Sequence, residues 1–164
     1  MKRFGWIILM AVILAGVADA QTNPPPPGPP AFYRLDFTLK EMEAGKAVSS
    51  RAYQMMVRTD DNAMSSIRAG GRVPVNSDKN SFTYIDVGVN IDVKRMTRVQ
   101  DELMLDVTAE ASGAVDGTTP PVVRQTKWNS TVLIPIRKSV TIFSSDDPAS
   151  KRQIQLDLTA TPVK

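Results

Sequence analysis

The chain has 164 residues, and its 20 Lys and Arg against 17 Asp and Glu give a formal charge of +3. It contains neither cysteine nor histidine. These absences exclude cysteine nucleophiles, disulfide frameworks, zinc sites built from Cys or His, and every catalytic triad that needs imidazole. The mild positive charge gives no electrostatic case for a nucleic-acid partner.

The first 20 residues have the three parts of a secretory signal peptide. Lys2 and Arg3 precede an uncharged apolar stretch from Phe4 to Ala18, and Ala18-Asp19-Ala20 fits a small-x-small cleavage site. The stretch is about 15 residues long, shorter than the roughly 20 that span a bilayer, so an uncleaved anchor is the weaker interpretation. We therefore expect residues 1–20 to be removed and the mature chain to be exported to the periplasm or outer envelope of a bacterium, where proteins without cysteine are common.

Residues 21–31 are predicted to form a proline-rich spacer. The run PPPPGPP at 24–30 holds six of the 12 prolines in the chain. Proline fixes φ and removes an amide donor, so this run favours an extended polyproline-II conformation outside the folded core. The remaining residues, 32–164, are long enough to bury one cooperative core without disulfides, and we expect them to form a single all-β domain.

An apolar period of two begins at Phe32 and predicts β-strands. A first hairpin is expected, whose return strand runs over 48–57. A short strand at 65–69 is expected to end in a turn at Gly70-Gly71. The alternating apolar residues of the first strand are Tyr33, Leu35, Phe37 and Leu39.

The same period continues to the end of the chain. A second long hairpin is expected to join 83–93 to 103–111 through a polar, basic linker at 94–102. Further extended runs cover 122–136, 140–143 and 154–160. About eight strands, with turns rich in Gly, Pro, Asp and Ser and no convincing helix, predict an all-β fold, either an antiparallel sandwich or a partly closed barrel.

Carboxylates are the main candidates for chemistry. The acidic turns Asp60-Asp61-Asn62 and Asp146-Asp147 lack the alternating ligands and the glycine of a calcium loop, so we interpret them as turns. Four carboxylates on polar strand faces could form a glycosidase-like pair, but no sequence feature raises the pKa of one above the others, and a solvated face is the better interpretation. These four are Asp86, Asp92, Asp106 and Glu110. We therefore predict no catalytic, metal or cofactor-binding residue, no cofactor, and a non-enzymatic protein.

Basic residues gather in two predicted loops and at the start of the last predicted strand. Such loops can meet lipid phosphates or anionic polysaccharide, although nearby acidic residues offset part of the field and favour a role in solubility. The residues are Lys94, Arg95 and Arg98 in one loop, Arg137 and Lys138 in the other, and Lys151 and Arg152 at the start of the strand. Trp128 and Phe143 fit core positions and form no stacking platform of the kind that single-stranded nucleic acid needs.

Four segments between residues 65 and 160 resemble, in order, the C-terminal β-domain of the bacterial secretins, the outer-membrane proteins of type II and type III secretion and of type IV pili. The segments are SSIRAGGRVPV at 65–75, FTYIDVGVNIDV at 82–93, LMLDVTAEASGAV at 103–115 and PPVVRQTKWNSTVLI at 120–134. The residues that match the family motifs, and to which the resemblance gives a structural role, are Gly70, Pro74, Asp86, Gly88, Ser112 and Arg124.

The resemblance implies a secretin-like β-core that acts through protein contacts. The partner would be another protein or a second copy paired through sheet edges, with outer-membrane association, in or beside a secretion or pilus system. Gly88, in the middle of a long strand, fits a bend or the close approach of another backbone. The alternative is a periplasmic β-barrel or sandwich that binds a small apolar or anionic ligand between the strands at 83–93 and 103–111.

Overall fold

The computed structural model of the protein describes residues 31–59, 63–78, 81–115, 122–147 and 151–163. The predicted signal peptide (1–20) and the predicted spacer up to residue 30 lie outside these residues, as does the acidic turn at 60–62. Within the described ranges, no helix is long and apolar enough to cross a membrane.

The described residues contain eight β-strands, in agreement with the sequence pattern. They are β1 (Phe32–Glu43), β2 (Lys46–Arg58), β3 (Ser65–Asp78), β4 (Ser81–Val99), β5 (Glu102–Val115), β6 (Val122–Pro135), β7 (Val140–Asp146) and β8 (Arg152–Val163).

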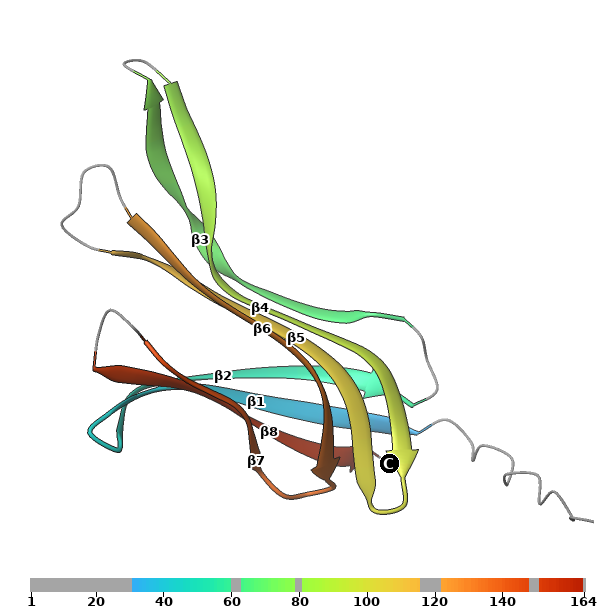
Figure 1. Ribbon diagram of the computed structural model, residues 1–164. Helices are drawn as coiled ribbons and strands as arrows, with labels where there is room; N and C mark the ends of the chain where they lie inside the picture. Colours follow the sequence, from blue (N-terminus) through green and yellow to red (C-terminus); the bar gives the residue numbers. More distant parts are fainter. Residues whose placement is uncertain (1–30, 60–62, 79–80, 116–121, 148–150, 164) are drawn as a thin grey trace, which may run out of the picture.

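The strands form two four-stranded antiparallel sheets that face each other without closing into a barrel (Figure 1). The first sheet has the order β2-β1-β8-β7, and the second has the order β3-β4-β5-β6. The central pair of the first sheet, β1 and β8, joins the two ends of the domain in one unbroken register from Phe32↔Val163 to Glu43↔Arg152. The predicted all-β fold is confirmed in its sandwich form.

The predicted hairpins are present. β1 and β2 pair across a tight turn in which Ala44 has φ 49° and Gly45 has φ 77°, the left-handed conformation that glycine adopts without cost. β4 and β5 form the second long hairpin, and β7 and β8 form a third.

Two local predictions are wrong. Gly70-Gly71 is not a turn. The two glycines lie inside β3, which is 14 residues long and pairs with β4 from Ser65↔Val93 to Asp78↔Ser81. The expected linker at 94–102 is mostly strand: β4 runs to Val99 with an irregularity between Lys94 and Thr97, and it buries Met96. In both places, pairing with a neighbouring strand overrides local composition.

The core lies between the sheets and follows the period of two. On the first sheet, the buried residues include Tyr33, Leu35, Phe37, Leu156 and Leu158. On the second sheet they include Ile91, Val93, Leu103, Leu105 and Ile134. A fully buried side chain of this size stabilises the fold by about 1.5–3 kcal/mol, so these facing rows hold the two sheets together.

Burial stops before the second sheet does. Along β4, Val89, Ile91 and Val93 are buried, but Ile85 is exposed although it has the same parity. Beyond Val89, β4 and its partner β3 project past the first sheet, which supplies no opposite layer to them (Figure 1).

Asp157 of β8 ties three strands of the first sheet together. Its Oδ2 accepts a hydrogen bond from Lys40 Nζ of β1 at 2.6 Å, and its Oδ1 accepts one from Thr141 Oγ1 of β7 at 2.6 Å. Partial burial by itself raises the pKa of Asp157. The hydrogen bonds from Lys40 and Thr141, together with the charge of Lys40, outweigh burial and hold this pKa below its usual 3.8.

Asp157→Asn should lower the free energy of unfolding by about 1–2 kcal/mol near pH 7, because the charge-assisted bond to Lys40 is lost. Since the folded-state pKa is depressed, the contribution of the carboxylate is present above about pH 4 and disappears as the pH falls through the folded-state pKa. Urea denaturation of the wild type and the variant should therefore give curves that converge in acid. Asp86→Asn, at an exposed carboxylate, is the control and should show little change at either pH.

Candidate assembly site

The second sheet divides part-way along its strands. The β4–β5 ladder runs from Val99↔Glu102 to Val89↔Ala111 and stops there, whereas β3–β4 and β5–β6 pairing continues. Two arms result, the β3–β4 arm (71–78 with 81–88) and the β5–β6 arm (112–115 with 122–125). We call the point of division the fork and define it by Gly70, Gly88 and Ser112. Figure 1 shows the β3–β4 arm projecting away from the first sheet.

Gly70 and Gly88 are opposite each other at the fork, with their backbones in close approach. A Cβ on Gly70 would lie 2.0 Å from the carbonyl oxygen of Val87, and a Cβ on Gly88 would lie 2.2 Å from that of Ala69. Gly88 also has φ 144°, a conformation that side chains rarely adopt. Both positions therefore require glycine.

Ser112 ends the β4–β5 ladder with its side chain. The Gly88 amide donates to Ser112 Oγ at 3.0 Å, and Ser112 Oγ donates to the Gly88 carbonyl oxygen at 3.4 Å. Gly88 and Ser112 would be the next pair of the ladder after Val89 and Ala111. The hydroxyl thus satisfies backbone groups of β4 that would otherwise lose their partners where the arms separate.

The β3–β4 arm carries two more of the motif residues. Asp86 accepts a hydrogen bond from Arg72 Nε across the arm at 2.9 Å, and both side chains are largely exposed, so this pair contributes little stability. Pro74 lies on β3, opposite Tyr84 of β4. Because β3 is an edge strand, the missing amide donor of proline is tolerated there.

Arg124 is on the β5–β6 arm, where it pairs with Gly113, the neighbour of Ser112. Its Nη1 lies 3.6 Å from Asp147 Oδ2, which follows β7 in the first sheet. The structure therefore places Gly88 in contact with Gly70 on one side and with Ser112 on the other, and it places Pro74, Asp86 and Arg124 on the two arms.

Sequence reasoning gave Arg72 no role and interpreted Asp147 only as part of an acidic turn; it assigned a partner to neither residue. Each is recognisable only from a partner that is distant along the chain: Arg72 from its cross-strand position opposite Asp86, and Asp147 from its position beside Arg124. The alternating pattern within one strand carries no information about either of these two contacts.

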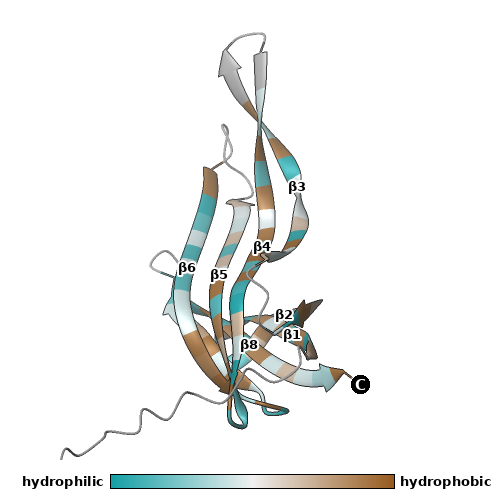
Figure 2. Cartoon of the chain, turned by 90° about the vertical axis from the view of Figure 1, so that its right-hand side faces the viewer, coloured by the Kyte–Doolittle hydropathy of each residue, from teal (hydrophilic) through white to brown (hydrophobic). Residues whose placement is uncertain are grey.

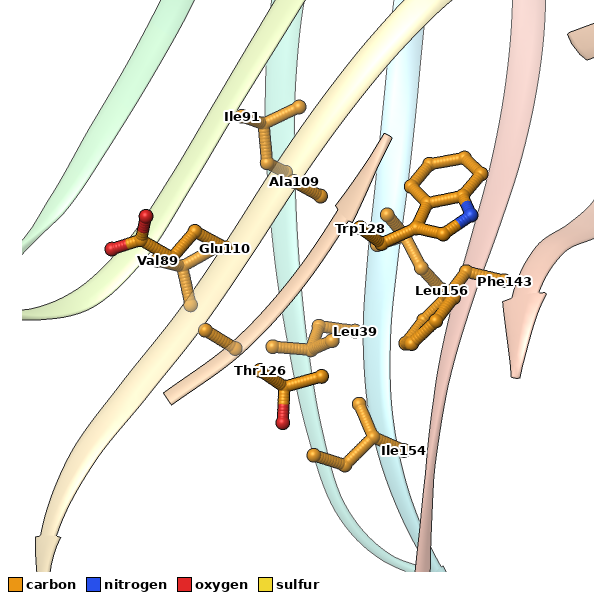
Figure 3. A pocket seen from close by; sticks show the side chains of 11 residues that line it. Leu39, Val89, Ile91, Ala109, Glu110, Thr126, Trp128, Phe143, Ile154 and Leu156 are labelled. Atoms are coloured by element: carbon orange, nitrogen blue, oxygen red, sulfur yellow. The ribbon is translucent and has the colours of Figure 1, made fainter. Parts of the chain in front are cut away.

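The interior offers little room for a ligand. The apolar cavity shown in Figure 3, lined by side chains that include Val89, Ile91, Trp128 and Leu156, has a volume of about 20 Å³, the space of about one water molecule. Trp128 also packs on Phe143 across the sheets, with ring centroids 5.5 Å apart. The strands expected to line a ligand pocket instead pack against the first sheet, and the ligand-binding alternative is not favoured.

A wider opening of about 380 Å³ lies between the sheets at the fork end. Its mouth carries charged residues in ion pairs. Arg51 and Arg152 both contact the Glu41 carboxylate, at 3.2 and 3.4 Å, and Arg124 contacts Asp147. The three arginines outnumber Glu41 and Asp147 by one charge, and each arginine lies in an ion pair with one of these carboxylates.

The carboxylates on the polar face of the second sheet each contact a basic or polar side chain. Asp92 accepts from Ser66 at 2.6 Å and lies 2.7 Å from Arg68 Nη2. Partial burial raises the pKa of Asp92, but the bonds from Ser66 and Arg68 and the positive charges of Arg68 and Lys94 hold it below its usual value. This direction is opposite to that of a glycosidase acid, whose pKa is raised. In the described residues, no group of three acidic side chains is placed to hold a metal ion.

The edges of the second sheet are open. β3 and β6 are its outer strands, each with 14 residues, and no segment of the described chain pairs with the outer edge of either one. Unpaired strand edges are templates for pairing with another strand. The fork and these two edges make up the candidate assembly site.

No known family model and no curated protein sequence matches this chain. Among solved structures, it is similar to the secretin of the ETEC pilotin–secretin AspS–GspD complex, with a TM-score of 0.50 and 11% identity over 82% of this chain and 47% of that one. It also matches the type II secretin GspD of E. coli K12, with a TM-score of 0.48 and 12% identity over 82% of this chain and 48% of that one.

A third match is the Salmonella SPI-1 type III injectisome secretin InvG, with a TM-score of 0.48 and 10% identity over 82% of this chain and 64% of that one. The chain spans about half the length of the two GspD chains that it matches. At such low identity, the similarity to the secretin of the pilotin complex establishes the fold alone: this is a secretin-like β-fold.

Gly70→Ala and Gly88→Ala should each lower the free energy of unfolding by about 1–3 kcal/mol, because the new methyl group meets rigid backbone atoms. Gly71→Ala is the matched control, since a Cβ there meets nothing within 4 Å. Urea denaturation should leave the control within about 0.5 kcal/mol of the wild type. Equal effects at all three glycines would contradict the assigned close approach.

Ser112→Ala should leave the part-buried Gly88 amide without its partner, at a cost of about 1 kcal/mol. Amide hydrogen exchange followed by NMR should show faster exchange at Gly88 in this variant. In the control, Ser130→Ala, the lost hydroxyl bonds only the carbonyl oxygen of the next residue, Thr131, and exchange at Gly88 should be unchanged. Slow exchange at Gly88 in both variants would remove the role assigned to Ser112.

Proposed function

We propose that this chain is an exported, non-enzymatic protein of the bacterial envelope that assembles through its sheet edges into a secretin-like wall or ring. It would be part of a secretion or pilus system or an accessory to one. The observation that carries the proposal is the open second sheet, which has two unpaired edge strands of equal length, β3 and β6.

The topology of the second sheet favours head-to-tail assembly. Because the sheet has four antiparallel strands, β3 and β6 run in opposite directions. When β6 of one copy meets β3 of the next, the new pair is therefore antiparallel and the ladder continues without a change of type. A heterologous contact of this kind closes into a ring if the rotation per copy permits and otherwise extends as a filament.

The β3–β4 arm supports the same proposal. Ile85 is exposed because the first sheet does not reach it, and Tyr84, on the outer face, is 62% exposed. A lone two-stranded ribbon is marginally stable in water, and large exposed apolar residues on it favour burial against a neighbouring copy. The glycine pair at the fork would set the angle at which each arm leaves the wall.

Two further observations support an envelope role with protein partners. The predicted signal peptide supports export, and a structural neighbour of this chain is a secretin in complex with a pilotin. The non-enzymatic part of the proposal rests on the lack of cysteine and histidine and on carboxylates that are held in ion pairs.

Disulfide cross-linking tests the edges, because the chain has no cysteine of its own. Ser66→Cys on β3 should be combined in turn with Asn129→Cys, Thr131→Cys or Leu133→Cys on β6, so that neighbouring registers are sampled. Within one copy, three strand spacings, about 14 Å, separate the two edges, beyond the reach of a disulfide. We expect at least one pair to give a ladder of oligomers on a non-reducing gel after oxidation.

The control places the cysteines on the outer strands of the first sheet, as Ser50→Cys with Ser144→Cys. Light scattering on the mature chain, residues 21–164, with and without detergent, gives the mass independently of cross-linking. A strict monomer in both conditions with no ladder from any β3–β6 pair would remove the assembly proposal. If only the control pair gave a series of cross-linked oligomers, the assembly contact would lie on the first sheet and not on the second.

A further inference from the structure

The end of the second sheet opposite the fork joins two turns. The Ile136 amide, after β6, donates to the Asp101 carbonyl oxygen in the β4–β5 turn at 3.1 Å. The next amide, of Arg137, donates to the Ala160 carbonyl oxygen of β8 at 2.8 Å. These bonds hold both turns at one end of the molecule, the lower end in Figure 1. We call this end the tip and define it as residues 94–104 and 133–139.

The tip is basic. It holds five Lys and Arg residues against two acidic residues, a surplus equal to the formal charge of the whole chain. The five are Lys94, Arg95, Arg98, Arg137 and Lys138. Arg137 and Lys138 are exposed, and they make no ion pair within the described part of the chain.

Two arginines of the tip have acidic partners. Arg98 lies 3.7 Å from Asp101, and Arg95 lies 3.2 Å from Asp106. The guanidinium side chains are more than half exposed in both pairs, so water and salt weaken the pairing and leave these charges available to an anionic surface.

Apolar side chains lie beside these charges. Met104 and Leu133 are direct cross-strand neighbours on the outer face of the second sheet, since Leu103 and Ile134 beside them are buried on the inner face. Val99 ends β4 on the same outer face, two positions beyond the residue that pairs with Met104. Leu133 is 51% exposed, Val99 42% and Met104 37%. Figure 2 shows hydrophobic segments low on these strands, with hydrophilic residues at the turn.

We propose that the tip binds the surface of a phospholipid bilayer that contains anionic lipid. A small apolar patch bordered by arginine and lysine is suited to the headgroup region, where the apolar side chains enter the boundary and the cations meet phosphate. Charge complementarity favours this occupant over a second copy of the chain, because two tips with the same positive surplus repel each other. The binding is peripheral and independent of ring formation, although an assembled ring would present many tips to one membrane.

Vesicle co-sedimentation of the mature chain tests the proposal. The vesicles are phosphatidylcholine alone or phosphatidylcholine with phosphatidylglycerol. We expect binding to the anionic vesicles at low salt and its loss near 1 M salt, where the screening length falls to about 3 Å. Arg137→Gln with Lys138→Gln should weaken binding by roughly tenfold or more, and Leu133→Ser should weaken it several-fold.

Matched controls remove the same groups far from the tip. Lys46→Gln with Lys151→Gln removes two exposed cations, and Val48→Ser removes an exposed apolar side chain; both variants should bind like the wild type. Equal binding to uncharged vesicles, full competition by inorganic phosphate, or equal loss in the control variants would each overturn the proposal. The proposal would also be overturned if the wild type did not bind vesicles but formed a dimer in solution that Leu133→Ser dissociates.

Discussion

The structure depends on the burial of one face of each sheet against the other. The first sheet is built on β1 and β8, which are 12 residues long, whereas β4 of the second sheet has 19. The first sheet can therefore cover only part of the second. The covered part forms the core. Beyond it, the β3–β4 arm has no opposite layer, and the β5–β6 arm is separated from the first sheet by the wider opening. The fork is thus a consequence of unequal strand length as well as of the glycines that occupy it.

The local pattern predicted the strands but not the extent of their burial. Ile85 and Val93 have the same parity in the same strand, and only Val93 is buried, because the opposite layer ends between them. The composition of Gly70-Gly71 likewise predicts a turn, and only the pairing of β3 with β4 keeps these residues extended. The β1–β8 register, which joins the two ends of the domain, has no signal in either strand alone.

The candidate site shows the same division between local and non-local information. Resemblance to a family placed Gly70, Gly88 and Ser112 in motifs, and strand pattern alone assigned Gly88 to a bend or close approach. Neither source gave the two contacts that Gly88 makes, with Gly70 and with Ser112. These contacts require two registers, Gly70↔Gly88 in one ladder and the end of the β4–β5 ladder at Val89↔Ala111 in another. The roles of side chains at the fork can be recognised only when the pairing of the strands is known.

The fork and the tip lie at opposite ends of the same strands, and this gives the second sheet a direction. If copies join head to tail through β3 and β6, every copy has the same orientation along the strands, because each is related to the next by the same operation. All tips then lie on one rim of the wall and all β3–β4 arms on the other. A basic, partly apolar rim that meets lipid would leave the arms on the far side, free to contact one another or a protein partner. A two-fold contact, β3 to β3, would instead place the tips on opposite rims, and a single flat membrane would engage only half of them. Lipid attachment and head-to-tail pairing are thus physically separate, but only together do they give an assembly with two chemically different ends.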